Sequence, residues 1–362
     1  MEKEPLKESQ IKDLIPPSEA ALHAFDALFP KIISFVNEKY ALEVKFLEQE
    51  VTTEQMRMLK DAHKRFGEFL FAVFEFHLYE NLLDEFFWYI SVFSCRGFKQ
   101  DYFDTIIKTW NIAIHSVIKP PESHELTRPL EWLHQNISLI FGSCSDIEEP
   151  PSDELQKFLN LLTAKKRKES TDYIIFLLKN GVTIEKLYSE LLPTAMREIG
   201  RLWQKNEMSV VDVHIATDIC RYITMRLADC TTITSHLPYN ALVTCVPGEE
   251  HEMGAEITEN YLEMKGWNVY SMGHIAPLED IINTIVTKTP DVVLLSVTLV
   301  ANLPATKTLI KKIRASVPTV KIVMGGHAAV LARDKLKDYV DVIVNSIEET
   351  HVHSLKLVDT HA

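Results

Sequence analysis

ALVTCVPGEEHEMG, residues 241–254, joins an apolar run to a loop that carries a histidine. The first six residues are mostly apolar or β-branched and predict a strand. The loop after them has the spacing E-x-H-x-x-G, with Glu249, His251 and Gly254 at its fixed positions. A histidine can bind a transition metal through one ring nitrogen while a carboxylate holds the other, and Glu249 is near enough in sequence to orient the loop. Taken alone, the spacing also fits an ordinary histidine on a surface loop.

The chain beyond residue 240 alternates between predicted strands and helices. Short apolar runs are separated by helical stretches, and they lie at 241–246, 268–272, 291–297, 321–324 and 341–344. Pro277 and Pro304 stand where the first turn of a helix tolerates a missing N–H. This alternation predicts a five-stranded parallel sheet with helices on both faces, in the flavodoxin-like order. Ligands of such sheets bind at the carboxyl edge, beside the first and third strands.

Three loops at that edge carry candidate binding residues. The first carries His251, the second carries Ser296 and Thr298, and the third carries Gly325 and Gly326. Paired glycines let a ligand come close to the backbone, although they also fit a plain strand-to-helix turn. Together the three loops favour a macrocycle with a central metal, whose nucleotide tail descends into the sheet.

These motifs resemble the signature of cobalamin-binding Rossmann-like domains of the base-off, histidine-on type. The resemblance implies that His251 is the lower ligand of cobalt, in place of the dimethylbenzimidazole of the cofactor. It implies that Ser296 and Thr298 line the slot for the displaced tail and that Gly325 and Gly326 make room for it. Glu250, beside the histidine, is a further candidate contact, while His274 and His327 are expected to be loop residues near the cofactor edge.

Residues 150–237 are expected to form a four-helix bundle. Helix boundaries are marked by capping residues and by a glycine, at Ser152, Gly181, Thr183 and the pair Ser209 and Asp212. Pro193 interrupts the third helix, and we expect a kink there.

The same bundle resembles the cap of cobalamin-dependent photoreceptors of the transcriptional-regulator type, whose pattern is a tryptophan, nine residues, a glutamate and a histidine. Trp203 and His214 match this pattern, with Val213 in place of the glutamate and Val210 as a further candidate contact. The resemblance implies that the tryptophan covers the upper ligand of cobalt and that His214 can become the upper ligand after light. Loss of the carboxylate removes a hydrogen-bonding contact worth about 0.5–1.5 kcal/mol. Methylcobalamin or hydroxocobalamin can therefore fit as well as adenosylcobalamin.

Residues 1–149 are expected to form an all-helical domain. Long amphipathic stretches lie at about 18–45, 52–94 and 99–118, followed by a break at Pro120-Pro121. Aromatic residues are concentrated between residues 66 and 110, and a helical core explains most of them. The run 86–89 points around the whole helix, so some of its rings are expected to face a partner or a flat ligand.

Photocobilins resemble this combination of cap and Rossmann-like domain, lack a DNA-binding domain, and bind a bilin beside the cobalamin. That resemblance implies that the aromatic region could hold biliverdin with help from one of four histidines, His63, His77, His115 or His134.

Bulk composition narrows the functional classes. With 51 acidic against 38 basic residues, a net charge of −13 and no basic helix-turn-helix segment, direct binding to nucleic acid is not expected. No apolar run suits a membrane span, and the opening residues do not resemble a secretory signal, so a cytoplasmic location is expected. The five cysteines show no C-x-x-C spacing, which predicts reduced thiols.

The sequence favours a light-sensing cobalamin protein whose output is a change of domain or quaternary arrangement. No catalytic base or nucleophile is identifiable in it. We therefore expect no enzyme, a homo-oligomer and an unidentified downstream protein partner. The alternative is a corrinoid carrier for methyl transfer, whose bundle and Rossmann-like domain are similar. A mutase subunit is disfavoured because the chain cannot hold a substrate barrel.

Overall fold

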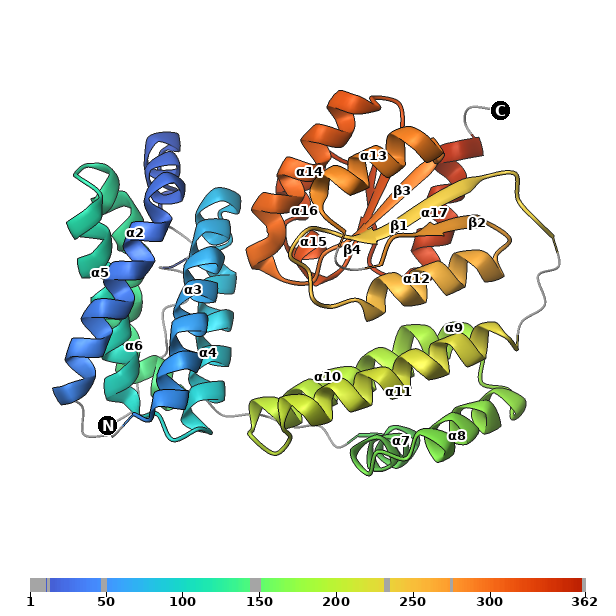
Figure 1. Ribbon diagram of the computed structural model, residues 1–362, viewed down its shortest axis with the longest axis horizontal. Coiled ribbons are helices and arrows are strands. Elements are labelled where there is room, and N and C mark those ends of the chain that lie inside the picture. Colours follow the sequence, from blue (N-terminus) through green and yellow to red (C-terminus); the bar gives the residue numbers. More distant parts are fainter. Residues whose placement is uncertain are drawn as a thin grey trace. The chain divides into compact units, whose positions relative to one another are not determined.

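The computed structural model describes most of the chain, namely residues 11, 14–46, 51–143, 151–230, 235–273 and 276–359. The chain divides into two compact units, Met1–Glu148 and Glu149–Ala362 (Figure 1). Cys144 and His274 lie outside the described residues. Of the cysteines within them, Cys95, Cys220, Cys230 and Cys245 are free thiols.

The first unit is helical. Its elements are α2 (Glu19–Glu43), the short η1 (Val44–Phe46), α3 (Thr53–Phe76), α4 (Tyr79–Ser94), α5 (Gln100–Val117) and α6 (Glu122–Ser143). The amphipathic stretch expected over 52–94 forms two helices, because the chain breaks between α3 and α4. His77 ends α3 in the left-handed region at φ 56°, with its N–H bonded to the carbonyl of Val73. Since no glycine or proline stands there, the sequence carried no ordinary signal of this break.

Aromatic rings fill the core of the first unit. Phe66 and Trp110 pack edge to face with ring centroids 6.0 Å apart, and Tyr40 packs the same way on Tyr102 at 5.7 Å. A Cβ added at Gly67 would come within 2.5 Å of ring atoms of Phe29 and Trp110. The core is therefore closely packed at this point.

The aromatic run on α4 splits between the core and the surface. Phe86 and Tyr89 are buried, whereas Trp88 is 40% exposed. Exposed and buried rings on one turn agree with the expectation that the run points around the helix.

The second unit begins with a helical bundle. Its elements are α7 (Asp153–Thr163), α8 (Arg167–Lys179), α9 (Ile184–Lys186), the π-helical segment η2 (Leu187–Leu191), α10 (Leu192–Gln204) and α11 (Val210–Ala228). Ser152, Thr183 and Ser209 are the N-caps of α7, α9 and α11, as expected, and Asp212 completes a capping box with Ser209.

The expected kink at Pro193 takes the form of a change in helix type. Residues 184–204 form one continuous helical segment, but its hydrogen bonding widens to the π pattern over Leu187–Leu191, just before the proline in the first turn of α10. A proline cannot donate the usual backbone hydrogen bond, so the preceding turn has to rearrange.

The sheet follows the expected order. Strands β1 (Asn240–Cys245), β2 (Asn268–Ser271), β3 (Val292–Ser296), β4 (Lys321–Gly325) and β5 (Val342–Ile343) are all parallel, in the order β2-β1-β3-β4-β5. The helices between and after them are α12 (Met253–Met264), α13 (Leu278–Lys288), α14 (Leu303–Ser316), α15 (His327–Leu331), α16 (Arg333–Leu336) and α17 (Ile347–Asp359), with the short η3 (Val300–Asn302) before α14. This confirms the predicted doubly wound fold.

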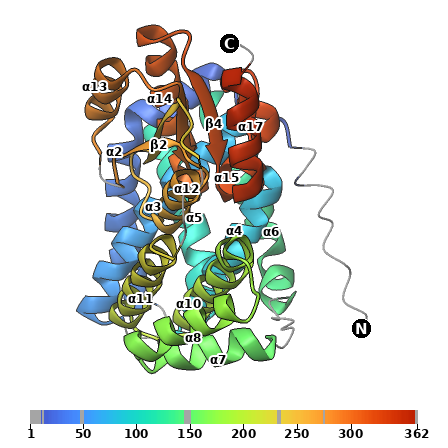
Figure 2. The same cartoon turned by 90° about the vertical axis from the view of Figure 1, so that its right-hand side faces the viewer.

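Helix α12 lies between the bundle and the sheet (Figures 1 and 2). Its Ile257 and Tyr261 belong to the apolar core of the bundle, whereas its Ala255 and Leu262 belong to the core between α12, α17 and the sheet. Lys265, which follows α12, pairs with Glu185 of α9 at 3.0 Å. Bundle and sheet therefore share one helix, which fixes the space between them.

Within the described residues, no helix is both long and apolar enough to span a bilayer.

Candidate functional site

The loop after β1 holds a histidine against a buried carboxylate. The Nδ1 atom of His251 lies 2.8 Å from Oε1 of Glu249, which also accepts a hydrogen bond from the His251 backbone N–H at 3.0 Å. The Glu249 side chain is fully buried, while that of His251 is 55% exposed. An ionised carboxylate accepts only, so Nδ1 carries a proton, and in the neutral ring Nε2 keeps its lone pair. That nitrogen is available to a metal.

Glu249 also ties this loop to the loop after β3. Its Oε2 accepts hydrogen bonds from the backbone N–H groups of Thr298 at 2.8 Å and Leu299 at 3.0 Å, and from the side-chain amide of Asn302 at 3.1 Å. The sequence suggested that Glu249 orients its own loop, but not that it joins the two loops. The partners lie about 50 residues further along the chain, and only the sheet order brings them together.

Hydrogen bonding keeps Glu249 ionised. Burial by itself raises its pKa, but the hydrogen bonds from the His251 ring and from the backbone of Leu299, Thr298 and His251 outweigh burial and lower the pKa to about 2. A depressed carboxyl pKa stabilises the fold above its unfolded value of 4.5, and this contribution is lost as the pH falls from there towards 2. The histidine therefore has a charged partner at neutral pH.

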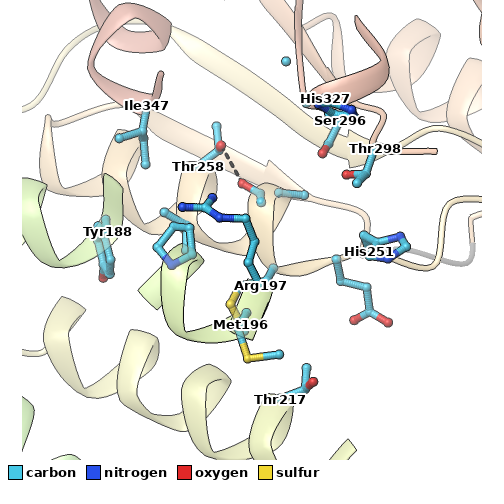
Figure 3. A pocket seen from close by; sticks show the side chains of 18 of the residues that line it. Tyr188, Met196, Arg197, Thr217, His251, Thr258, Ser296, Thr298, His327 and Ile347 are labelled. Atoms are coloured by element: carbon cyan, nitrogen blue, oxygen red, sulfur yellow. Dashed lines mark hydrogen bonds between the residues drawn. The ribbon is translucent and has the colours of Figure 1, made fainter. Parts of the chain in front are cut away.

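A cavity of about 1190 Å³ opens between the bundle and the carboxyl edge of the sheet. All but one of the candidate residues line it, namely Trp203, Val210, Val213, His214, Glu250, His251, Gly254, Ser296, Thr298, Gly325 and Gly326. Glu249 is the exception, because it is buried behind His251. Figure 3 shows His251, Ser296, Thr298 and His327 gathered on the sheet side of this cavity. The fold thus brings together motifs that are separated in the sequence.

Glycines shape the sheet side of the cavity for two different reasons. Gly326 has φ 101°, and a Cβ there would lie 2.2 Å from the carbonyl oxygen of Val297, so the backbone itself requires glycine. A Cβ at Gly325 would meet only Val344 at 3.4 Å, and one at Gly254 would meet Ser296 Oγ at 3.5 Å. At these two positions the missing side chain leaves space rather than avoiding a clash.

The bundle side is formed by η2, α10 and α11. Val213 occupies the position of the family's glutamate and contributes an apolar side chain to the wall that holds Trp203 and His214. Sequence reasoning missed several neighbours on this wall, namely Tyr188, Met196, Arg197, Thr217, Asp218 and Arg221. Counting back in helical steps from Trp203 and forward from His214 gives Met196, Thr217 and Arg221, so periodicity was a usable signal. Arg197 points into the cavity (Figure 3).

The sheet side also contains residues that the motifs did not include. His327 lines the cavity, in agreement with its expected place near the cofactor edge. Thr258, one helical turn after Gly254, lines it as well, as do Ile347 and Thr350 of α17.

The set of donor atoms suits a metal that brings most of its own ligands. Within the described residues, no group of three or more His, Cys, Asp or Glu side chains could hold a bare ion. His251 offers a single nitrogen, with its second nitrogen held by a carboxylate, as metal-binding histidines usually are. The cavity volume exceeds the roughly 300–1,000 Å³ of ordinary small-molecule pockets. A macrocyclic metal complex such as a corrinoid fits both observations.

The four candidate bilin histidines of the first unit have different surroundings. His63 is buried, and its Nδ1 lies 3.0 Å from the side-chain oxygen of Asn37. His134 pairs with Asp104 at 2.9 Å, and His115 lies 3.3 Å from the hydroxyl of Thr127. His77 is exposed at the end of α3. Burial lowers the pKa of His63 to about 3, so this ring is neutral.

Comparison with known proteins agrees with this site. Residues 239–353 and 156–227 each match a family described as a B12 binding domain. The chain is 25% identical over 145 residues to the HTH-type transcriptional repressor CarH of Myxococcus xanthus, a match that covers 40% of this chain. It spans about half of that relative, 48% of its length.

Solved structures that match this chain include the monomethylamine corrinoid protein of Methanosarcina barkeri, with 13% identity, a TM-score of 0.48, and coverage of 57% of this chain and 98% of that one. A cobalamin-binding protein from Desulfitobacterium hafniense DCB-2 has 15% identity and a TM-score of 0.30, with 56% of this chain and 98% of that one covered. On the evidence of the two matched domains and of the histidine loop, residues 156–353 form a CarH-like cobalamin-binding module, with a helical domain followed by a Rossmann-like domain.

Proposed function

We propose that this protein is a light-responsive cobalamin sensor. The observation that carries the proposal is that Trp203 and His214, on the bundle wall, line the same cavity as His251 on the sheet wall. Cobalt held by His251 would face the bundle with its upper side. The residues that differ between a sensor and a simple carrier are therefore in a position to contact the upper ligand.

His251, supported by Glu249, would hold the cofactor on the sheet side of the cavity. The carboxylate orients the imidazole so that Nε2 is the free nitrogen, and the hydrogen bonds of Glu249 to Thr298 and Leu299 join this loop to the loop after β3. Ser296 and Thr298, which follow β3, would border the slot for the nucleotide tail. Gly325 and Gly326 follow β4, so they lie on the other side of β3 from the histidine loop. These residues supply affinity in the dark and after illumination alike.

Trp203 and His214 provide the response. An alkylcobalamin, when bound, supplies a cobalt–carbon bond that light can break. Trp203 packs against an upper group only while that group is present, so its contacts differ between the two states, and such a difference is what shifts an equilibrium. Movement of α10 and α11 would then change the quaternary arrangement of a homo-oligomer. We propose no enzymatic step and no direct contact with nucleic acid.

We propose adenosylcobalamin as the native form of the cofactor. We also propose that the first unit can bind a second chromophore, a bilin. Val213 offers the ribose no hydrogen bond, so methylcobalamin is also expected to bind. For biliverdin, the close packing around Gly67 leaves no space between Phe29 and Trp110. A bilin at that point must displace core side chains, whereas one near the exposed Trp88 would not.

Illumination tests the proposal. Protein loaded with adenosylcobalamin in the dark should change its absorption spectrum and its elution volume under green light. The illuminated protein should show the spectrum of a cobalamin with histidine on both sides, and a His214→Ala variant should lack that spectrum. Unchanged spectra and elution under light would contradict a sensor. Adding biliverdin to the same protein tests the second chromophore by its long-wavelength absorption.

A corrinoid carrier for methyl transfer is the second candidate. It is favoured by the wall around Val213, where Val210 and Met196 also line the cavity and suit a small methyl group. Transfer of a methyl group from bound methylcobalamin to a thiol acceptor in the dark, without any response to light, would favour this function.

A further inference from the structure

The part of the cavity between the sheet, α12 and α17 has an apolar interior. Val243 of β1, Leu294 of β3 and Val323 of β4 are direct neighbours in the strand register and all line the cavity. They lie two residues inside the carboxyl edge, below Cys245, Ser296 and Gly325, and point to the same face of the sheet. We call these three residues the strand row.

The strand row is closed to water. Val243, Leu294 and Val323 are 1%, 4% and 1% exposed, and the adjoining Ala255 and Val344 are 3% and 5% exposed. A ligand group that reaches this depth leaves solvent behind. Any polar atom on it must then find a partner in the protein or remain unpaired.

Two of the hydroxyl groups that line this part of the cavity are already hydrogen-bonded within their own helices. The hydroxyl of Thr258 donates to the carbonyl of Gly254 at 2.7 Å, and that of Thr350 donates to the carbonyl of Ser346 at 3.1 Å. The side chains of the strand row are apolar, so they can pair with no polar atom of a ligand.

We propose that this slot selects corrinoids by their lower base, favouring 5,6-dimethylbenzimidazole over a purine such as adenine. The inference rests on the proposed binding of a corrinoid through His251. Dimethylbenzimidazole has an apolar edge with two methyl groups, and its ribose bond leaves only one free ring nitrogen. Adenine adds an exocyclic amine and further ring nitrogens, and these would be buried unpaired beside valine and leucine.

Equilibrium binding in the dark tests the selection. Hydroxocobalamin, its adenine-containing counterpart and cobinamide, which has no base, should each be titrated into the full chain and followed by visible absorption. Adenine in place of dimethylbenzimidazole should weaken binding roughly 10- to 100-fold. Equal or tighter binding of the adenine form would overturn the inference. If none of the three binds, cobinamide included, then the proposed binding of a corrinoid has failed instead.

Two matched variants test whether the strand row causes the preference for dimethylbenzimidazole. Val323→Thr adds a hydroxyl to the strand row, whereas Val293→Thr makes the same change at a buried position of β3 on the opposite face. V323T should reduce the preference for dimethylbenzimidazole several-fold, and V293T should leave it unchanged. Unaltered binding of cobinamide checks that each variant is folded. An undiminished preference in V323T would contradict the assignment to the strand row.

Discussion

Two histidines of this chain differ in their surroundings, and this difference distinguishes a histidine of the core from one that can bind a metal. His63 and His251 each engage Nδ1 with a side-chain oxygen, at 3.0 Å and 2.8 Å. For His63 the partner is the neutral amide of Asn37, and the buried ring packs edge to face on Tyr40. For His251 the partner is an ionised carboxylate and the ring is half exposed in a cavity. Charge on the partner and access to the free nitrogen, rather than the imidazole itself, make the difference.

The largest expected effect comes from removing the exposed ring. His251→Ala should weaken corrinoid binding by more than about 100-fold, because it deletes a metal ligand rather than one of its supports. His236→Ala is the control, since that histidine is exposed and lies outside the cavity lining. Titration followed by visible absorption measures both. If H251A bound a corrinoid as tightly as the unaltered protein, His251 would not be a cobalt ligand.

Removing the charge of the partner should have the next largest effect. Glu249→Gln keeps the size of the side chain but not its charge, and should lower corrinoid affinity about 10- to 100-fold. Glu190→Gln, at an exposed position of η2, is the control. Because Glu249 acts on cobalt through His251, the double variant should bind no more weakly than H251A. Additive losses would show that Glu249 contributes by another route.

The buried ring should make the first unit sensitive to acid. The folded pKa of His63, about 3, lies below the unfolded value of 6.5. The unfolded state therefore takes up a proton first, and stability that is present above pH 6.5 is lost as the pH falls towards 3. Between pH 7 and pH 5 the contribution of His63 to the free energy of unfolding should fall by about 2 kcal/mol. Burial raises the pKa of Glu85 in the same unit to about 7, so this carboxyl contributes in the opposite direction.

Hydrogen exchange of the amides in α3 measures this loss. Between pH 7 and pH 5, His63→Gln should lose less stability than the unaltered protein, whereas His134→Gln, whose ring is partly exposed, should respond like the unaltered protein. The same acid response in H63Q as in the unaltered protein would show that another group is responsible.

The smallest expected effect concerns an exposed link between the two walls of the cavity. Arg221 of α11 pairs with Glu252 at 2.6 Å and with Glu256 at 2.7 Å, and its side chain is 35% exposed. Arg221→Gln should lower the free energy of unfolding by less than about 1 kcal/mol, because solvent screens such pairs. Arg226→Gln, on the same helix and 3.8 Å from Asp229, is the control. Denaturant titration measures both, and a loss of several kcal/mol in R221Q would mean that this link matters as much as the buried carboxylate.

The second unit was more predictable than the first because its local signals agree. Alternating apolar runs, capping residues and the order of the loops each pointed to one arrangement, and strands and caps were found where they were expected. In the first unit, α3 and α4 form one unbroken apolar pattern in the sequence, and their separation depends on His77 adopting a left-handed conformation. That conformation is set by packing, so a pattern of hydrophobic residues could not predict it.

The sequence by itself determined the fold of the second unit, the three loops at its carboxyl edge and the residue types available there, because periodicity and helix caps are local properties. Only the tertiary structure decided that Glu249 bonds to Thr298 and Leu299 and that the bundle residue Arg197 enters the cavity. It also decided that Val243, Leu294 and Val323 form one dry row. These contacts join residues from distant parts of the chain, and their geometry depends on how strands pair and how α12 packs between bundle and sheet.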